Sequence, residues 1–220
     1  PETPVARRFG RAQVKPKKRD TPGPVTPIAY GNQENQSSEV AEKIAAPGRF
    51  KNRCRHYLGA LGYLSRGSRP DITFFVNFLL RYVDKWTVDL DKKLLWLFCY
   101  LHFNATYVLC NLIDVRDTLS FSVKVLPDAS HADADDRRST SGFFLFGIGE
   151  YGSLSTIEWG SGLLTTVTLS TQESEGGGLL RATRAAIPIT SLSEVMLGRD
   201  LVGMEAESDN RAPITNLDKG

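Results

Sequence analysis

The chain of 220 residues is 41% hydrophobic and 10% aromatic, which is enough for one domain of ordinary size. It contains no run of eighteen apolar residues, which predicts a protein without a membrane-spanning helix and without a membrane partner. Its net charge of +2 is uneven: residues 1–120 hold 19 Lys and Arg against 11 Asp and Glu, whereas residues 121–220 hold 8 against 14. This asymmetry predicts a basic half that meets polyanions and an acidic half that holds metal.

Residues 1–48 are rich in Pro, Arg, Lys, Gln and Ser and poor in large apolar side chains. Such a segment cannot offset its ordering entropy alone, which predicts a disordered or extended basic arm. Three interpretations stay open: a solvated linker, an arm on nucleic-acid phosphates, or an Arg-rich import sequence of an organelle such as the mitochondrion. In the second interpretation seven basic residues supply the phosphate contacts, namely Arg7, Arg8, Arg11, Lys15, Lys17, Lys18 and Arg19.

Residues 49–118 are expected to form a helical segment. From about Arg53 to Leu112 the pattern is helical, with apolar residues at spacings of three and four after Arg69-Pro70-Asp71, a sequence typical of a helix start. A second apolar segment, from about Leu90 to Phe103, carries Leu, Trp and Phe on several faces and is therefore expected to be well buried. The apolar residues of the first repeat are Ile72, Phe75, Val76, Leu79, Leu80 and Val83.

Residues 119–220 have the pattern of short strands followed by helix. Three consecutive strands, joined by tight turns and antiparallel, are predicted at Ser120–Leu126, Ser141–Ile148 and Ser155–Trp159. Thr165–Leu169 is predicted to be extended. A last strand at Leu201–Ala206 would deliver Glu207, Ser208 and Asp209.

The helix predicted after Ser170 has unusual residues in its interior. Ser170 and the acids that follow it are typical of a helix start, but Gly176, Gly177 and Gly178 each cost about 1 kcal/mol relative to Ala. Pro188 is expected to kink or break the helix. A second helical piece, about Ser191 to Leu197, is expected to end at Gly198.

The acidic stretch after the first predicted strand is the strongest candidate for chemistry. An acidic residue at the end of a strand can hold a divalent metal over a rigid sheet, which makes Asp128 the first candidate. The other three acids, Asp133, Asp135 and Asp136, are interpreted as a solvated turn with local ion pairs to Arg137 and Arg138.

Five motifs in order resemble copia-type retrotransposon polyproteins. The segment Tyr63–Thr73 with Arg81-Tyr82 resembles their connection segment, and Asp128-Ala129 followed by residues 135–142 resembles the start of their ribonuclease H domain. The stretch entering the first helix of that domain is similar to three motifs here: Trp159-Gly160-Ser161, Thr168-Leu169-Ser170-Thr171 and Glu173-Ser174-Glu175. Ser208-Asp209-Asn210 resembles the later Asp-Asn element. The resemblance covers roughly residues 55–217.

This resemblance implies an α/β fold with a mixed, ribonuclease H-like sheet. It also implies hydrolysis of the RNA strand of an RNA–DNA hybrid by two Mg²⁺ ions about 4 Å apart, which activate water and stabilise the leaving oxygen. Asp128, Glu175 and Asp209 take the positions of the catalytic, metal-binding carboxylates, and carboxylate oxygens suit Mg²⁺.

The chain departs from the family at several of these positions. The family's fourth metal-site residue lies in a helix well beyond the Asp-Asn element, and Asp218 is too close to replace it, so the ribonuclease H-like part is interpreted as truncated at its C-terminus. Three glycines follow Glu175, and a flexible backbone positions a carboxylate poorly. His131 stands where the family usually has Trp and is interpreted as a surface or packing substitution.

Three functions are therefore carried forward. The first is a retroelement-derived domain with impaired catalysis that binds nucleic acid or scaffolds a larger assembly, such as a ribonucleoprotein. The second is an active Mg²⁺-dependent ribonuclease H, and the third is a purely protein-binding subunit. An intracellular location is expected, because Cys54, Cys99 and Cys110 lack Cys-x-x-Cys spacing and are interpreted as free thiols.

Overall fold

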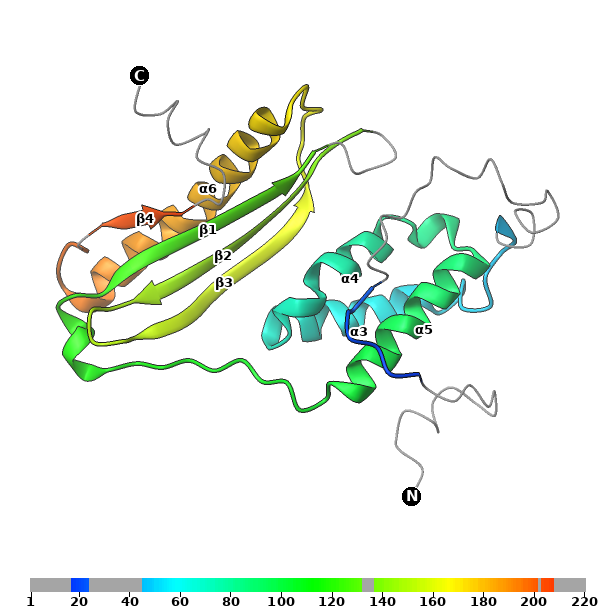
Figure 1. The fold of residues 1–220 in the computed structure, drawn as a ribbon, viewed down its shortest axis with the longest axis horizontal. Coiled ribbons are helices and arrows are strands. Elements are labelled where there is room, and N and C mark those ends of the chain that lie inside the picture. Colours follow the sequence, from blue (N-terminus) through cyan, green and yellow to red (C-terminus); the bar gives the residue numbers. More distant parts are fainter. Residues whose placement is uncertain (1–16, 24–44, 132–136, 202, 208–220) are drawn as a thin grey trace.

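The computed structural model describes residues 17–23, 45–131, 137–201 and 203–207. Three helices gather at one end of the molecule, and a four-stranded sheet with a long covering helix lies at the other (Figure 1). The helices are α3 (Cys54–Gly67), α4 (Thr73–Leu80) and α5 (Val88–Phe103), and short 3₁₀ turns occur at Pro70–Ile72, Val83–Lys85 and Val115–Thr118. The fold is thus mixed α/β, as the sequence predicted.

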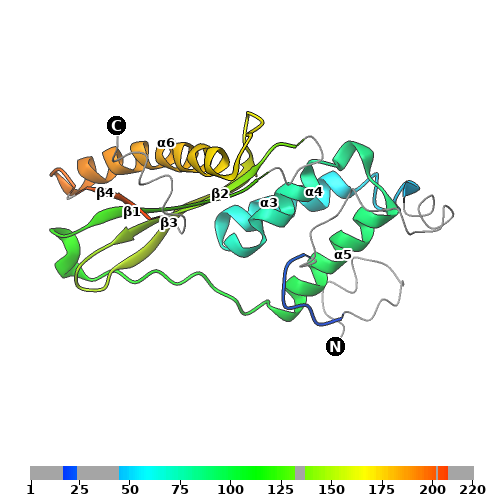
Figure 2. The same cartoon turned by 45° about the horizontal axis from the view of Figure 1, so that its top comes forward.

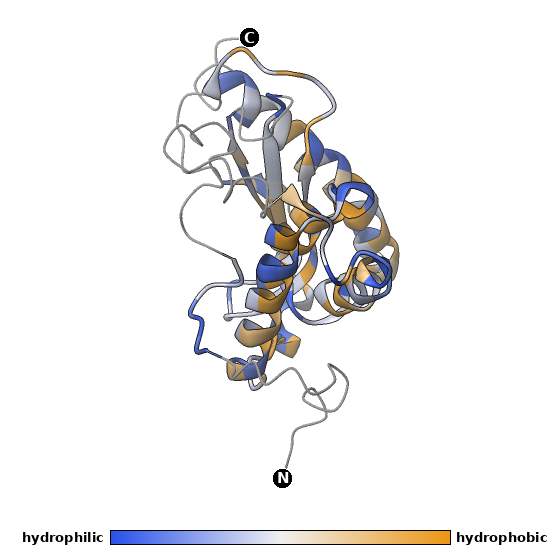
Figure 3. Cartoon of the chain, turned by 90° about the vertical axis from the view of Figure 1, so that its right-hand side faces the viewer, coloured by the Kyte–Doolittle hydropathy of each residue, from blue (hydrophilic) through white to orange (hydrophobic). Residues whose placement is uncertain are grey.

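The helical region, α3 to α5, has its own hydrophobic core. Thirteen buried residues between Cys54 and Tyr100 form one cluster, and Leu58, Leu79 and Leu94 in it are fully buried. Figure 3 shows the apolar residues, in orange, along these helices. The expected burial of the second apolar segment is confirmed, because Leu90, Leu94, Leu97 and Tyr100 of α5 are all buried.

The predicted helical pattern is wrong beyond Phe103. Residues 104–112 form no helix and run as an extended connection toward the sheet (Figure 1). The backbone of Leu112 exchanges two hydrogen bonds with Leu154, at 2.9 and 2.8 Å, so the connection lies along the outer strand. Its apolar residues, such as Val108 and Leu112, are exposed, so no burial favours a helix here.

The sheet has the strand order β3-β2-β1-β4. Its strands are β1 (Ser122–Ser130), β2 (Thr140–Ile148), β3 (Leu154–Leu163) and β4 (Met204–Ala206). The first three pair antiparallel, and β4 pairs parallel with β1 at Val123–Val125. All four predicted strands therefore exist, but the segment 165–169, predicted to be extended, lies outside every strand.

One long helix, α6 (Thr171–Leu197), covers one face of this sheet (Figure 2). Val125, Phe143 and Leu145 pack against Ala182 and Ala186 of α6 in a second, smaller core. Side chains alternate across a strand, so the neighbours of these residues project from the opposite face.

The prediction that Pro188 separates two helical pieces is wrong, because α6 is a single helix. Pro188 lies on the exposed side of α6, where water can satisfy the carbonyl that the missing N–H leaves free. Ala186 and Ile189 hold the helix on the sheet around the proline. The predicted ends are confirmed: Ser170 Oγ accepts the N–H of Glu173 at 3.2 Å, and Gly198 ends the helix at φ 66°.

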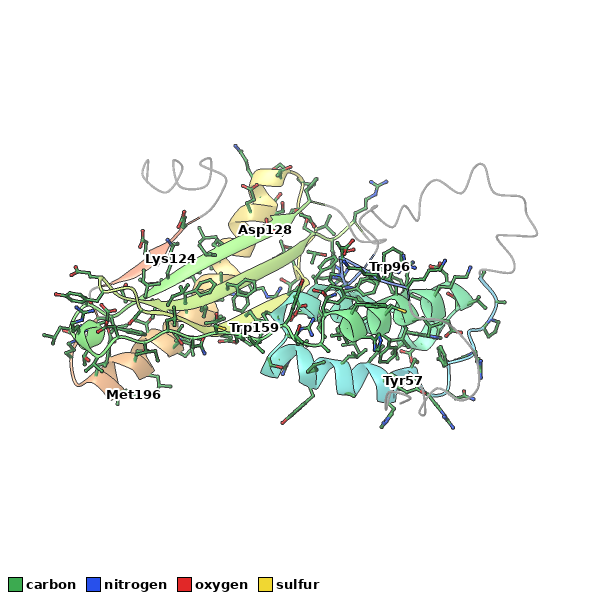
Figure 4. All side chains as sticks on the ribbon, turned by 60° about the horizontal axis from the view of Figure 1, so that its bottom comes forward. Tyr57, Trp96, Lys124, Asp128, Trp159 and Met196 are labelled. Carbon is green, nitrogen blue, oxygen red and sulfur yellow. The ribbon has the colours of Figure 1, made fainter. Side chains whose placement is uncertain are left out.

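The helical region meets the sheet mainly at β3. Trp159 Nε1 donates to the carbonyl of Ser65 in α3 at 2.8 Å, and Asn77 Nδ2 of α4 donates to the carbonyl of Ser161 at 2.9 Å. Figure 4 shows the labelled Trp159 between the sheet and the helices. Trp159 pairs with Phe144, whose strand neighbours Phe143 and Leu145 face α6, so this contact lies on the face of the sheet away from α6.

Candidate functional site

Asp128 lies inside β1, two residues before its end, rather than after the strand as the sequence suggested. It pairs with Gly142 of β2, and its side chain is exposed. The next residue, Ala129, faces α6, because an ideal Cβ on Gly178 would lie 3.2 Å from the Ala129 Cβ. Asp128 therefore projects from the face away from α6.

Glu175 lies near the start of α6, and the glycines that follow it are part of the helix. Gly178 approaches the carbonyl of Asp128 and the side chains of Ala129 and Ser141, so a residue without a side chain lets α6 lie directly on β1 and β2. The glycine segment thus seats the helix that carries Glu175. Among the described residues, the buried Oε2 atom of Glu175 has no hydrogen-bond partner.

These carboxylates do not by themselves make a magnesium site. Glu175 is on the α6 side of the sheet, whereas Asp128 projects from the other face, and Asp209 lies outside the described residues. No three His, Cys, Asp or Glu side chains gather into a metal-binding group in the part of the chain that the structure describes. Among the described residues, the orphaned Oε2 of Glu175 suits a hard cation.

Asp133, Asp135 and Asp136 also lie outside the described residues. His131 is exposed, and its Nδ1 lies 3.3 Å from Thr168 Oγ1, which in turn lies 2.6 Å from Ser139 Oγ. His131 is therefore part of a small hydrogen-bonded chain that ties the end of β1 to the loop before α6.

Two arginines hold the start of β2 from opposite faces. Arg81, at the end of α4, donates to Thr140 Oγ1 at 3.2 Å. Arg181, in α6, donates to the next residue, Ser141, at its Oγ (2.8 Å) and its carbonyl (3.1 Å). Arg137 and Arg138 precede β2 at the same end of the sheet as Asp128.

Sequence reasoning missed Arg81 and Arg181 as site residues. Arg81 stood in a motif of the connection segment, but nothing in that motif indicates a contact with the sheet. Arg181 has no local signal, because its role depends on strand residues 19 and 40 positions away along the chain.

The basic arm is described at residues 17–23, where it lies against α5, and at residues 45–48, where Pro47 forms an isolated bridge with Thr87. The guanidinium of Arg19 stacks on Trp96, 3.6 Å from the ring centroid, and Trp96 Nε1 donates to the carbonyl of Thr21 at 2.9 Å. Lys17 and Lys18 are exposed. The remaining predicted phosphate ligands, Arg7, Arg8, Arg11 and Lys15, lie outside the described residues. Arg19 is thus used in an intramolecular contact.

A cavity of about 390 Å³ in the helical region is lined by residues 68–71 and 106–109. The buried Arg69 there forms two hydrogen bonds with Asp71, at 2.9 and 2.7 Å, and Asp71 also accepts from the hydroxyl of Tyr100 at 2.7 Å. Burial and the bond to Asp71 raise the pKa of Tyr100 to about 12. Tyr100 therefore stays protonated at neutral pH, and the cluster acts as a closed structural network.

Asp117 performs a similar structural role for the sheet. Its buried carboxylate accepts hydrogen bonds from Ser120 Oγ (2.7 Å) and from the backbone N–H groups of Tyr151 (2.8 Å) and Ser153 (3.0 Å). Burial raises the pKa of Asp117, but these hydrogen bonds outweigh it and hold the pKa well below the usual range. The carboxylate thus stays charged and fixes the β2–β3 turn to the segment before β1.

No helix in the described part of the chain combines the length and the apolar character that crossing a membrane requires. A search against models of known protein families finds none that matches this chain.

Proposed function

We propose that this chain is a nucleic-acid-binding domain with a ribonuclease H-like fold, derived from a copia-type retroelement and impaired in catalysis. It acts as a binding or scaffolding component of a larger assembly, such as a ribonucleoprotein. The observation that carries the proposal is the guanidinium of Arg181 at the β1–β2 end of the sheet, whose acceptors among the described residues are neutral oxygens of Ser141 and Gly162. Lys and Arg side chains that neutralise phosphates release counterions and so favour binding.

The architecture supports this proposal. Three antiparallel strands and a parallel fourth, with one helix across a face, agree with the mixed sheet that the family resemblance implies. The separation of Asp128 and Glu175 on opposite sides of the sheet favours impaired catalysis over metal-dependent hydrolysis. Mg²⁺ is therefore proposed as a cofactor only for an active form.

Binding and cleavage are tested together on the full chain. Fluorescence anisotropy in EDTA with an RNA–DNA hybrid, a duplex RNA and a single-stranded RNA should give affinities that fall as KCl rises. Labelled hybrid incubated with Mg²⁺ or Mn²⁺ should stay intact. The absence of salt-dependent affinity for all three probes would show that the nucleic-acid proposal is wrong and leave the protein-binding alternative.

An active ribonuclease H is the second candidate, and the unpaired, buried Oε2 of Glu175 favours it. A carboxylate oxygen without a hydrogen-bond partner is costly to bury unless a cation or water satisfies it. This candidate predicts metal-dependent cleavage of the RNA strand, lost in Asp128→Asn and in Glu175→Gln but kept in the control Glu173→Gln. Glu173 is the control because it only caps α6, through the N–H of Leu169 at 2.6 Å.

The compartment stays a prediction. An intracellular location, with the mitochondrion as one alternative, rests on the cysteine spacing and on the Arg-rich arm. In the structure Cys54 is buried, Cys99 is half-buried and Cys110 is exposed, all as free thiols.

A further inference from the structure

Arg181 lies where α6 crosses the ends of β2 and β3. Its Nη1 atom donates to the carbonyl of Ser141 (3.1 Å), to Ser141 Oγ (2.8 Å) and to the carbonyl of Gly162 (3.1 Å). An ideal Cβ on Gly162 would lie 3.1 Å from Nη2, so a glycine at this position gives the guanidinium room across the backbone of β3. The arginine is thereby held in one orientation by two strands.

All three of these acceptors are neutral. Among the described residues, no Asp or Glu oxygen lies within 4.0 Å of the guanidinium of Arg181, and the ion pairs that are present use other cations. Burial lowers the pKa of Arg181, yet arginine keeps its charge in proteins. A half-buried cation without a counter-ion is unusual, because partial desolvation of a charge is normally offset by a paired acid.

One edge of this guanidinium is still available. Its Nη2 and Nε atoms have no acceptor in the described parts of the chain, and neither atom is among those buried without a partner, so both reach solvent. The N–H groups along one edge of a guanidinium form a planar fork that matches two oxygens of a phosphate. The fork is oriented in advance by its bonds to Ser141 and Gly162.

We propose that the Nε and Nη2 edge of Arg181 binds a backbone phosphate of a nucleic acid at the β1–β2 end of the sheet, an inference that rests on the nucleic-acid binding proposed above. The phosphate replaces the missing acidic partner of a half-buried cation. The site lies beside the strand pair that carries Asp128, since Ser141 pairs with Ala129. Arg181 would thus fix the position of the nucleic-acid backbone relative to the sheet.

The test compares Arg181→Gln with Arg184→Gln in the full chain. Arg184 is exposed on the same helix, and Arg184→Gln changes the net charge by the same amount as Arg181→Gln. It therefore controls for the loss of one positive charge. The probe is an RNA–DNA hybrid titrated by anisotropy in EDTA over a series of KCl concentrations. Arg181→Gln should weaken binding about tenfold, the size expected for loss of a charge-assisted hydrogen bond. It should also lower the slope of log affinity against log salt by about one.

Several results would contradict the proposal that Arg181 binds a backbone phosphate. Unchanged binding by Arg181→Gln, or an equal loss in Arg184→Gln, would show that Arg181 is not a specific phosphate ligand. If the wild-type chain binds no nucleic acid, the proposed function fails and this inference fails with it. If the wild type binds and Arg181→Gln binds equally well, only this inference fails.

Two further measurements are needed. One shows whether each variant still folds, and the other shows whether the site binds free phosphate instead of a nucleic-acid phosphate. Circular dichroism checks the fold of each variant, and if Arg181→Gln does not fold, Arg181→Lys carries the test. Lysine keeps the charge but not the planar fork, so the affinity should fall while the salt dependence stays the same. Unchanged affinity would show that the planar geometry of the guanidinium is not needed for binding. Calorimetry with inorganic phosphate alone should show no saturable binding at millimolar concentration, and saturable binding lost in the variant would assign the site to free phosphate instead.

Discussion

The helical region and the sheet region differ in whether their buried acids are paired, although Thr73 Oγ1 of α4 is also buried without a partner among the described residues. In the helical region the carboxylates are satisfied: Asp71 by Arg69 and Tyr100, and Asp91 by the backbone of residues 49–50 and by Trp86. Among the described residues of the sheet region, α6 carries a buried carboxylate oxygen without a hydrogen-bond partner, on Glu175, and a half-buried guanidinium without an acidic partner, on Arg181. Groups that a fold leaves unsatisfied are candidates for binding, whereas closed networks hold structure.

The hydrophobic core of the helical region is also larger than the core of the sheet region. Thirteen buried residues make the helical core, whereas five make the core between α6 and the sheet. The sheet region is therefore expected to open more readily, and the five substitutions below probe this difference in order of decreasing effect.

The largest effect is expected in the helical core. Leu94 is fully buried in α5, so Leu94→Ala should lower the free energy of unfolding by about 2–5 kcal/mol, through lost burial and a residual cavity. Urea denaturation followed by circular dichroism measures the change. Leu192→Ala is the control, because Leu192 is exposed on α6, and equal losses in both variants would contradict the described packing.

Substitutions at two glycines of α6 should change the stability in opposite directions. An ideal Cβ on Gly178 already lies 3.2 Å from Ala129, so Gly178→Leu should overpack the contact between helix and sheet and cost about 1–3 kcal/mol. Nothing lies within 4 Å of an ideal Cβ on Gly176, so Gly176→Ala should stabilise the helix by up to about 1 kcal/mol. Thermal unfolding of both variants measures these changes in stability. A stabilising Gly178→Leu would contradict the close contact between α6 and the sheet at Gly178.

Asp117 gives the sheet region a pH dependence. The pKa of Asp117 is lowered in the folded protein, so its contribution to stability is present above the unfolded value near 3.8. That contribution is lost as the pH falls below this value toward the lower folded pKa. Asp117→Asn should therefore be less stable than wild type at neutral pH, with the gap closing below about pH 4. Urea midpoints across acidic pH measure it, and a constant gap would contradict the hydrogen-bonded carboxylate.

The smallest effect is expected where residues 17–23 lie on α5. Trp96→Phe keeps an aromatic ring near Arg19 but removes the donor to Thr21, which should cost about 1 kcal/mol locally. Trypsin should then cleave faster after Lys17 and Lys18, as judged by mass spectrometry. Tyr63→Phe, at an exposed site, is the matched control, and equal cleavage in the two variants would contradict the contact.

Local signals predicted the parts of this fold that depend on neighbouring residues. Strand alternation found β1, β2 and β3, and the cap residues Ser170 and Gly198 located both ends of α6. The break at Pro188 was wrongly predicted, because packing of α6 on the sheet outweighs one lost hydrogen bond. The extent of β1 was underestimated, since pairing with β2 carries the strand past Pro127 and Asp128.

The candidate site depended on contacts between distant segments and was harder to predict. The sequence identified Asp128 and Glu175 as acids of interest, but not the faces of the sheet on which they lie. It gave no indication that Arg19 would stack on Trp96 or that Arg181 would lie across Ser141 and Gly162. Each of these contacts joins segments at least nineteen residues apart, beyond the reach of helix or strand periodicity.

Hydrogen exchange with and without a saturating RNA–DNA hybrid is the most direct test of a nucleic-acid site on the sheet, because it compares the two regions in one experiment. Protection is expected at the β1–β2 end of the sheet and in the first half of α6, around Ala129, Ser141 and Arg181. Exchange in α3, α4 and the buried part of α5 should not change. Protection confined to the helical region, or no protection anywhere, would contradict a nucleic-acid site on the sheet.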